Sequence, residues 1–169
     1  LPNEVQIVDI LIHKAGRKLL VASSAGDGFI VPEDDVLAQT RSGKQVLNVR
    51  GDAKAMICAP VTGDADAVAV VGENRKVLVF GLDELPEMGR GKGVRLQKYK
   101  DGGMSDAITF SRENGLSWQD PAGRTRTEAD LTEWTGKRAT AGRMAPRGFP
   151  RDNRFGSFGW RSNPVFSRL

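Results

Sequence analysis

Residues 67–80 read Ala-Val-Ala-Val-Val-Gly-Glu-Asn-Arg-Lys-Val-Leu-Val-Phe. Two apolar runs rich in β-branched residues, 67–71 and 76–80, flank a short polar turn that begins at Gly72. Branched side chains fit a pleated sheet, and glycine or asparagine between two such runs is typical of an antiparallel turn. We therefore predict a β-hairpin over this stretch.

The hairpin pattern occurs twice more along the chain. An earlier copy has apolar runs at 18–23 and 29–31, separated by a polar segment with two glycines. A weaker later copy has Leu-Ser-Trp at 116–118 and a strand at 124–127. Hairpins repeated in this way predict several similar β units rather than one large sheet.

Each copy continues with an acidic turn and a Gly-Lys pair. In the first copy, residues 32–37 place proline and acids where one short helical turn would begin. The Gly-Lys pairs begin at Gly43, Gly91 and Gly136, so they recur about every 45 to 48 residues, within the range of propeller blades. One small sheet cannot cover its own apolar faces, so each copy must pack on its neighbours.

These features predict an all-β, propeller-like array of about three four-stranded blades in a partial disc. Further strands are predicted at 5–12 and 46–49, and residues 53–61 form a further apolar run. The predicted division of the chain is residues 1–61 for the first blade, 62–111 for the second, 112–138 for a third, partial blade and 139–169 for a basic tail rich in Gly, Arg and Pro. The tail lacks a sustained period, and its composition is typical of segments without a fixed structure.

Charge is distributed unevenly along the chain. The net charge is +4, but residues from Lys137 onward contribute about +7 and the preceding residues about −3. Residues 88–100 contain no carboxylate, and the loop at 89–93 has three glycines. A flexible cationic loop attracts a polyanion and lets it approach the backbone closely.

The candidate binding residues are cations of these loops, most of which we predict to line one rim at equivalent positions of successive blades. They are Arg41, Lys44, Arg90, Lys92, Arg95, Lys98, Lys100, Lys137 and Arg138. Solvent-exposed loops also carry cations without binding anything, so charge alone leaves both interpretations open.

Other residue types argue against an enzyme or a metal site on this chain. The single cysteine, Cys58, excludes a disulfide framework and favours a reducing compartment. His13 has no second His or Cys at ligand spacing, and the Gly-Lys pairs lack the other residues of a nucleotide-binding loop. We predict no cofactor, no metal and no catalytic residue here.

Three further expectations concern the core, the membrane and the chain's extent. Cys58, Trp118 and Trp134 are expected in the core. No apolar run approaches the roughly 20 residues of a membrane helix. Because the chain starts at Leu1 within an apparent fold, we expect it to be a piece of a longer polypeptide.

Several stretches in order carry a family resemblance: residues 18–23, 28–31, 43–44, 85–93, 135–138 and 147–149. They resemble the C-terminal domain of the A subunit of bacterial DNA topoisomerase IV. The related gyrase A subunits carry a box of the pattern Gln-basic-Arg-Gly-Gly-Lys-Gly. Residues 87–93 are Glu-Met-Gly-Arg-Gly-Lys-Gly, so only Gly91, Lys92 and Gly93 match fully. This departure favours topoisomerase IV over gyrase and argues against tight DNA wrapping.

The resemblance implies a β-pinwheel, a propeller-like disc in which adjacent blades exchange strands and duplex DNA bends around a basic rim. It implies a non-catalytic module that positions DNA for ATP-dependent strand passage, meaning decatenation and relaxation in chromosome segregation. The parent enzyme would use ATP and Mg²⁺ on other domains or on its B subunit. Its tyrosine nucleophile would lie upstream of Leu1, which leaves Tyr99 as an aromatic residue on the rim.

The resemblance also implies a location and leaves a second function open. The expected location is the cytoplasm, at the nucleoid or peripherally at the inner membrane. The second hypothesis is a protein-interaction platform, in which a regulatory protein docks on a blade or adds a strand to an exposed sheet edge.

Overall fold

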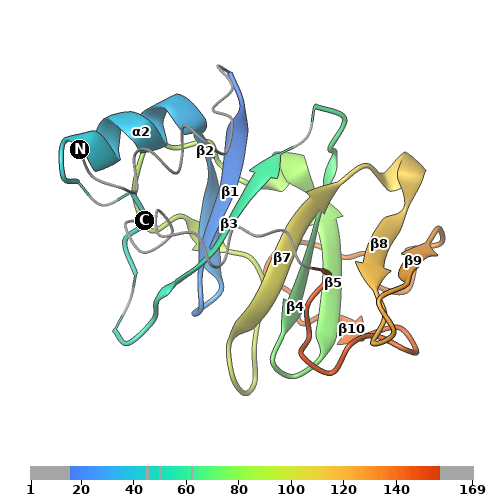
Figure 1. The fold of residues 1–169 in the computed structure, drawn as a ribbon. Coiled ribbons are helices and arrows are strands. Elements are labelled where there is room, and N and C mark those ends of the chain that lie inside the picture. The colour runs from blue at the N-terminus through green and yellow to red at the C-terminus, as the bar shows by residue number, and fades with distance from the viewer. Residues whose placement is uncertain (1–15, 45, 50, 62, 157–169) are drawn as a thin grey trace.

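The computed structural model describes residues 16–156 apart from 45, 50 and 62 (Figure 1). Within this part, the chain forms two four-stranded antiparallel sheets and one two-stranded sheet, with three short helices. The predicted all-β class is confirmed. The strand predicted at 5–12, His13 and the end of the predicted tail lie outside the described residues.

The first sheet has the strand order β3-β1-β2-β6. Strands β1 (Lys18–Ser23) and β2 (Asp27–Pro32) form the first predicted hairpin. Strand β3 (Ala55–Val61) pairs with the other edge of β1. The short strand β6 (Val94–Arg95) pairs with β2 and completes the sheet.

The second sheet repeats this arrangement with the order β10-β5-β4-β7. Strands β4 (Ala67–Gly72) and β5 (Lys76–Gly81) form the hairpin. Strand β7 (Met104–Phe110) pairs with β4, and the two-residue strand β10 (Arg143–Met144) pairs with β5. The third unit consists of β8 (Leu116–Gln119) and β9 (Thr125–Glu128).

Neighbouring units exchange strands. Strand β6 follows β5 along the chain but completes the first sheet, and β10 follows β9 but completes the second. Gly93 and Gly142 precede these strands with φ of 80° and 82°. A Cβ atom on either residue would collide with a backbone carbonyl oxygen, that of Gly28 or of Val77. Only glycine permits this approach, and the shared geometry makes the two crossings equivalent.

The helix α2 (Glu33–Arg41) corrects the prediction of a single helical turn at 32–37. Three acids in its first turn and Arg41 in its last turn complement the helix dipole. Val36 and Leu37 are buried. Because these two residues form its main apolar contact, no helical period was visible in the sequence. The other two helices are the 3₁₀ turns η1 (Leu82–Glu84) and η2 (Arg112–Asn114).

The first sheet is buried on both faces because alternate side chains point to opposite sides. Leu19, Val21 and Phe29 pack with Val36 of α2 and with Leu47. The opposite face of the sheet contacts the second sheet, and the two sheets lie side by side as successive layers (Figure 1). This inter-sheet core contains Leu20, Ala22, Ile30, Ile57, Val68, Val70, Leu78, Phe80, Leu85, Leu96, Met104 and Ala107.

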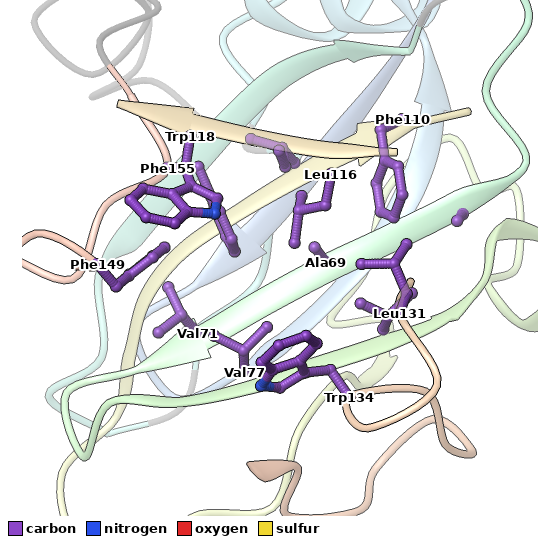
Figure 2. Packing of buried hydrophobic residues seen from close by; sticks show 13 residues of the cluster. Ala69, Val71, Val77, Phe110, Leu116, Trp118, Leu131, Trp134, Phe149 and Phe155 are labelled. Carbon is purple, nitrogen blue, oxygen red and sulfur yellow. The ribbon is translucent and has the colours of Figure 1, made fainter. Parts of the chain in front are cut away.

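The outer face of the second sheet is covered by the third unit and by residues 131–155 (Figure 2). Phe149 meets Trp118 and Phe155 edge to face, with ring centroids 5.4 and 5.5 Å away. Trp118 and Trp134 are both buried here, as predicted. Strand β10, Phe149 and Phe155 all fall within the predicted tail, so the tail is packed as far as the structure describes it.

Arg75 holds the loop at 149–153 against the turn between β4 and β5. Its guanidinium donates to the carbonyl oxygens of Pro150 at 2.8 Å and Phe149 at 3.0 Å, and to Oδ1 of Asn153 at 3.0 Å. A planar fork of donors suits several acceptors at once. The C-terminal segment is therefore attached by polar contacts as well as by its aromatic side chains.

Candidate nucleic-acid interface

Most of the cationic candidates lie on two segments that cross from one unit to the preceding sheet. The first crossover segment, residues 86–98, runs along β2, where Ile30 N–H donates to Pro86 O at 2.9 Å. The second crossover segment, residues 134–145, runs along β5, where Val79 N–H donates to Trp134 O at 2.8 Å. Each segment then ends in the short edge strand of that sheet, β6 or β10.

The three Gly-Lys pairs do not occupy equivalent positions in successive units, so this part of the sequence prediction is wrong. Gly43 follows α2 with φ of 77°, whereas Gly91 lies on the first crossover segment and bridges to Leu47. On the second crossover segment, Gly136 donates its N–H to Val79 O on β5 at 2.9 Å. The equivalent bond on the first crossover segment, to Ile30 O on β2, is donated by Met88 and not by Gly91. A glycine beside a lysine suits several backbone settings, so its recurrence did not imply a shared position.

The first cationic group consists of Arg41, Lys44, Arg90 and Lys92. Two members lie at the end of α2 and just beyond it, and two lie on the first crossover segment. The bridge between Leu47 and Gly91 brings these two loops together. All four residues are exposed. The group is therefore an accessible cationic surface built from parts of the chain that are distant in sequence.

Acids border this group. Glu87 pairs with Lys18 at 3.2 Å, with both side chains about half exposed. The carboxylate of Asp35 lies beside Gly89, so that a Cβ on this glycine would be 3.6 Å from Oδ2. These acids limit the positive potential on the α2 side, whereas Lys92 makes no ion pair among the described residues.

The second cationic group consists of Arg95, Lys98, Lys137 and Arg138, where the two crossover segments touch. Ala139 N–H donates to Leu96 O at 2.9 Å, and Lys98 N–H donates to Thr140 O at 3.0 Å. Arg95, Lys98 and Lys137 are exposed, and Arg138 is partly buried. The structure thus brings together four candidates from residues 95–98 and 137–138.

Lys100 belongs to neither group. It lies in the turn before β7, next to residues that contact both hairpin turns. Gly103 N–H donates to Oε1 of Glu73 at 3.1 Å, and Met104 N–H donates to Ser24 O at 2.9 Å. Lys100 is exposed, and the partly buried residue Tyr99 lies between it and Lys98 in the sequence.

Tyr99 is not a rim aromatic, which corrects the prediction from the sequence. The residue is partly buried, and its ring packs against the core between the sheets and lies against Gly26 and Gly72. Burial raises the pKa of its hydroxyl, and Arg95 only partly offsets this effect. Cys58 is buried as predicted, and burial raises the pKa of its thiol to about 12. Both groups therefore stay protonated at neutral pH, and neither is an activated nucleophile.

Comparison with known proteins assigns this architecture to a family. Residues 17–61 and 66–109 match the family described as DNA gyrase C-terminal domain, beta-propeller. The chain belongs to this family. It is 49% identical to the A subunit of DNA topoisomerase 4 from Caulobacter vibrioides over 92% of its own length and 20% of that protein. It is 32% identical to the Pseudomonas aeruginosa protein of the same name, over 84% of the chain and 20% of that protein.

Solved structures agree with the family assignment at the level of the fold. The C-terminal domain of Escherichia coli ParC matches with a TM-score of 0.67 and 24% identity, over 82% of this chain and 59% of that one. A DNA gyrase A C-terminal domain matches with a TM-score of 0.57 and 17% identity, over 76% and 43%. The resemblance drawn from the sequence is confirmed. The chain spans about a fifth of the length of the curated relatives that it matches.

This gyrase-type domain has one further cation beside the second cationic group, Arg143 on β10, which the sequence pattern placed only within the tail. Arg143 lines an open hollow of about 270 Å³ together with Leu78, Trp134, Gly136 and Thr140. Nothing in the sequence separated it from other tail arginines. Its position depends on the pairing of β10 with β5.

Neither a metal-binding cluster nor a membrane helix occurs in the described part of this gyrase-type domain. Among residues 16–156, with the stated gaps, no three His, Cys, Asp or Glu side chains gather closely enough to hold a metal ion. In the same part of the chain, no helix combines the length and apolar character needed to cross a bilayer.

Proposed function

We propose that this gyrase-type domain binds duplex DNA through the exposed cations of both cationic groups, as the non-catalytic DNA-binding and bending module of a topoisomerase IV A subunit. One observation carries the proposal. Arg90, Lys92, Arg95 and Lys98 are exposed and follow one another on a single segment that joins the first cationic group to the second. The relatives are named as A subunits of DNA topoisomerase 4, and these names supply the parent enzyme.

Electrostatics determines what this surface can recognise. Lysine and arginine side chains spaced along a path neutralise successive phosphates, and the release of condensed counterions supplies most of the affinity. Phosphate contacts of this kind fix position without reading base sequence. We therefore expect binding with little sequence preference and a steep dependence on salt.

The proposal extends to the whole protein. Within a topoisomerase IV A subunit, the domain would hold a DNA segment for ATP-dependent strand passage, and thereby for decatenation and relaxation during chromosome segregation. ATP and Mg²⁺ would be used by other domains or by the B subunit, which this domain meets only through the full-length A subunit. The work would take place at the nucleoid in the cytoplasm.

The test is the salt dependence of DNA binding. The plot of log affinity against log salt has a negative slope, whose magnitude should fall by about 0.9 for each phosphate that is no longer neutralised. Arg90→Gln with Lys92→Gln should therefore reduce this magnitude by about 1.8 for every duplex sequence. Arg124→Gln is the matched control, because Arg124 is a 74% exposed arginine on the third unit, outside both groups. An affinity that does not change with salt, or an equal loss in the control, would reject the proposal.

One observation favours the second hypothesis, a platform for a regulatory protein. Met144 is 58% exposed on β10, which is an edge strand of the second sheet. We propose that a partner protein could add a strand there. Met144→Lys should then abolish partner capture from the source bacterium while DNA affinity is retained. Unchanged capture would reject this second function.

A further inference from the structure

The two crossover segments touch each other next to Arg138, and the contact is built from main-chain groups. The reciprocal hydrogen bonds between residues 96–98 and 139–140 form one side of it. Arg138 adds one more bond between the segments, because its Nη1 donates to Arg95 O at 2.7 Å. Its backbone N–H donates to Oε1 of Glu84, on the turn η1, at 3.0 Å. The guanidinium of Arg138 is therefore bonded to the backbone of the first crossover segment.

The neighbouring cation Lys137 is arranged differently. Its side chain is exposed and makes no hydrogen bond or ion pair within the described part of the chain. Arg138 is partly buried, and its Nε is shielded from solvent without a hydrogen-bond partner among the described residues. Of these two adjacent cations, Lys137 is therefore exposed to solvent, whereas Arg138 contacts the first crossover segment.

The backbone at this contact is held in an unusual conformation. Ala139 has φ of 70°, in the left-handed region that residues with a Cβ seldom adopt. Such a conformation persists only where surrounding contacts over-determine it. Here the contacts are the bond from Ala139 N–H to Leu96 O and the two bonds made by Arg138.

We infer that Arg138 is a positioning residue, which sets the spacing between Arg95 and Lys98 on one segment and Lys137 on the other, rather than a phosphate ligand. This inference rests on the proposed function and deepens it. DNA phosphates have fixed spacing along a strand, so cations on two separate segments can bind neighbouring phosphates only if the distance between the segments is fixed. Arg138 fixes it through Arg95 O, together with the main-chain bonds between residues 96–98 and 139–140.

Four variants separate positioning from direct binding. A lysine at 138 keeps the charge but lacks the planar donor fork of arginine. Arg138→Lys and Arg138→Gln should therefore weaken DNA binding about equally, by roughly 5- to 10-fold, because both lose the spacing that lets the neighbouring cations reach their phosphates. At Lys137 the charge should decide the affinity: Lys137→Arg should bind like the wild type, and Lys137→Gln should reduce the magnitude of the salt slope by about 0.9.

A second readout needs no DNA. In native-state hydrogen exchange, Arg138→Lys should speed exchange at the amides of Lys98 and Ala139, which bond across the contact, while Lys137→Arg leaves both protected. All binding is measured well below each variant's melting temperature, so that a loss of overall stability does not change the affinity.

The outcomes distinguish the two proposals. Wild-type affinity in Arg138→Lys, with or without a loss in Arg138→Gln, overturns the positioning role, as does unchanged exchange at Lys98 and Ala139. If Lys137→Gln and the Arg90/Lys92 double variant both retain the wild-type affinity and slope, the proposed DNA interface fails instead. Faster exchange in Arg138→Lys would then still establish the contact between the segments.

Discussion

The backbone N–H of Phe155 donates to Oδ2 of Asp106 at 2.8 Å, in a buried bond that joins the C-terminal segment to β7. The other oxygen of the same carboxylate accepts the N–H of Ala107 at 2.9 Å. Nearby, Ser105 Oγ donates to Asn153 O at 2.8 Å. The C-terminal segment, which is rich in Gly, Arg and Pro, is thus attached to the second sheet by polar side chains of its strand β7.

Replacing Asp106 with alanine should destabilise the domain. The change leaves the buried N–H of Phe155 without its acceptor, which costs about 1–3 kcal/mol of unfolding free energy. Urea denaturation measures the loss, with Asp101→Ala, on an exposed turn, as control. If Asp106→Ala is as stable as the control, Phe155 is held by packing alone.

The equivalence of Gly93 and Gly142 predicts equal effects of substitution. Alanine at either position would collide with the carbonyl oxygen of Gly28 or Val77, and each change should cost about 2–4 kcal/mol by strain and overpacking. Thermal unfolding measures both. Gly123 is the matched control, because its φ is also positive at 84° but no atom lies within 4 Å of a Cβ there. Gly123→Ala should cost only about 1 kcal/mol.

Equal losses at Gly93 and Gly123 would show that the conformation, and not the close crossing, requires glycine. That result would remove the argument that the two crossovers are equivalent.

Tyr99 should tolerate loss of its hydroxyl but not of its ring. The ring fills the space against Gly26 and Gly72, and the hydroxyl is buried without a partner among the described residues. Tyr99→Ala should therefore cost about 3 kcal/mol, whereas Tyr99→Phe should stay within about 1 kcal/mol of the wild type. Chemical denaturation measures both values. A large loss in Tyr99→Phe would mean that the hydroxyl bonds to a group outside the described residues.

The hairpin of β8 and β9 should loosen in acid. Asp120 accepts the N–H of Arg124 at 2.9 Å, the guanidinium of Arg126 at 3.2 Å and the N–H of Ala122 at 3.0 Å, and these bonds lower the pKa of its carboxyl below the usual 3.8. Because the folded pKa lies below the unfolded one, the stabilisation is present above the unfolded pKa. It is lost as pH falls through the folded pKa.

Amide exchange at Arg124, followed from pH 6 down to about 2 by NMR, measures this effect. Exchange corrected for intrinsic pH effects should rise below about pH 4, and Asp120→Asn should remove this rise. A wild-type rise that persists in Asp120→Asn would assign the acid sensitivity to another group.

Local sequence determined the hairpins. The branched apolar residues in 18–31 and 67–80 specify paired strands. Successive side chains of a strand point to opposite faces of the sheet, and both faces are buried here, so consecutive apolar residues are accommodated. The exposed cations of the loops were also evident, since charge and glycine content are local properties. The family resemblance followed from the same stretches.

Tertiary contacts decided the rest. Arg95 and Arg138 meet only because β6 returns to the first sheet and residues 137–140 run beside it, and no local pattern encodes the distance between two segments 43 residues apart. Gly43, Gly91 and Gly136 have the same neighbour in sequence but different backbone partners. Composition predicted no structure for residues 139–156, yet Phe149 and Phe155 are buried because the second sheet offers an apolar face that only they and their neighbours cover. Burial of that face is a property of the assembled units, whereas pairing within each hairpin is a property of its own sequence.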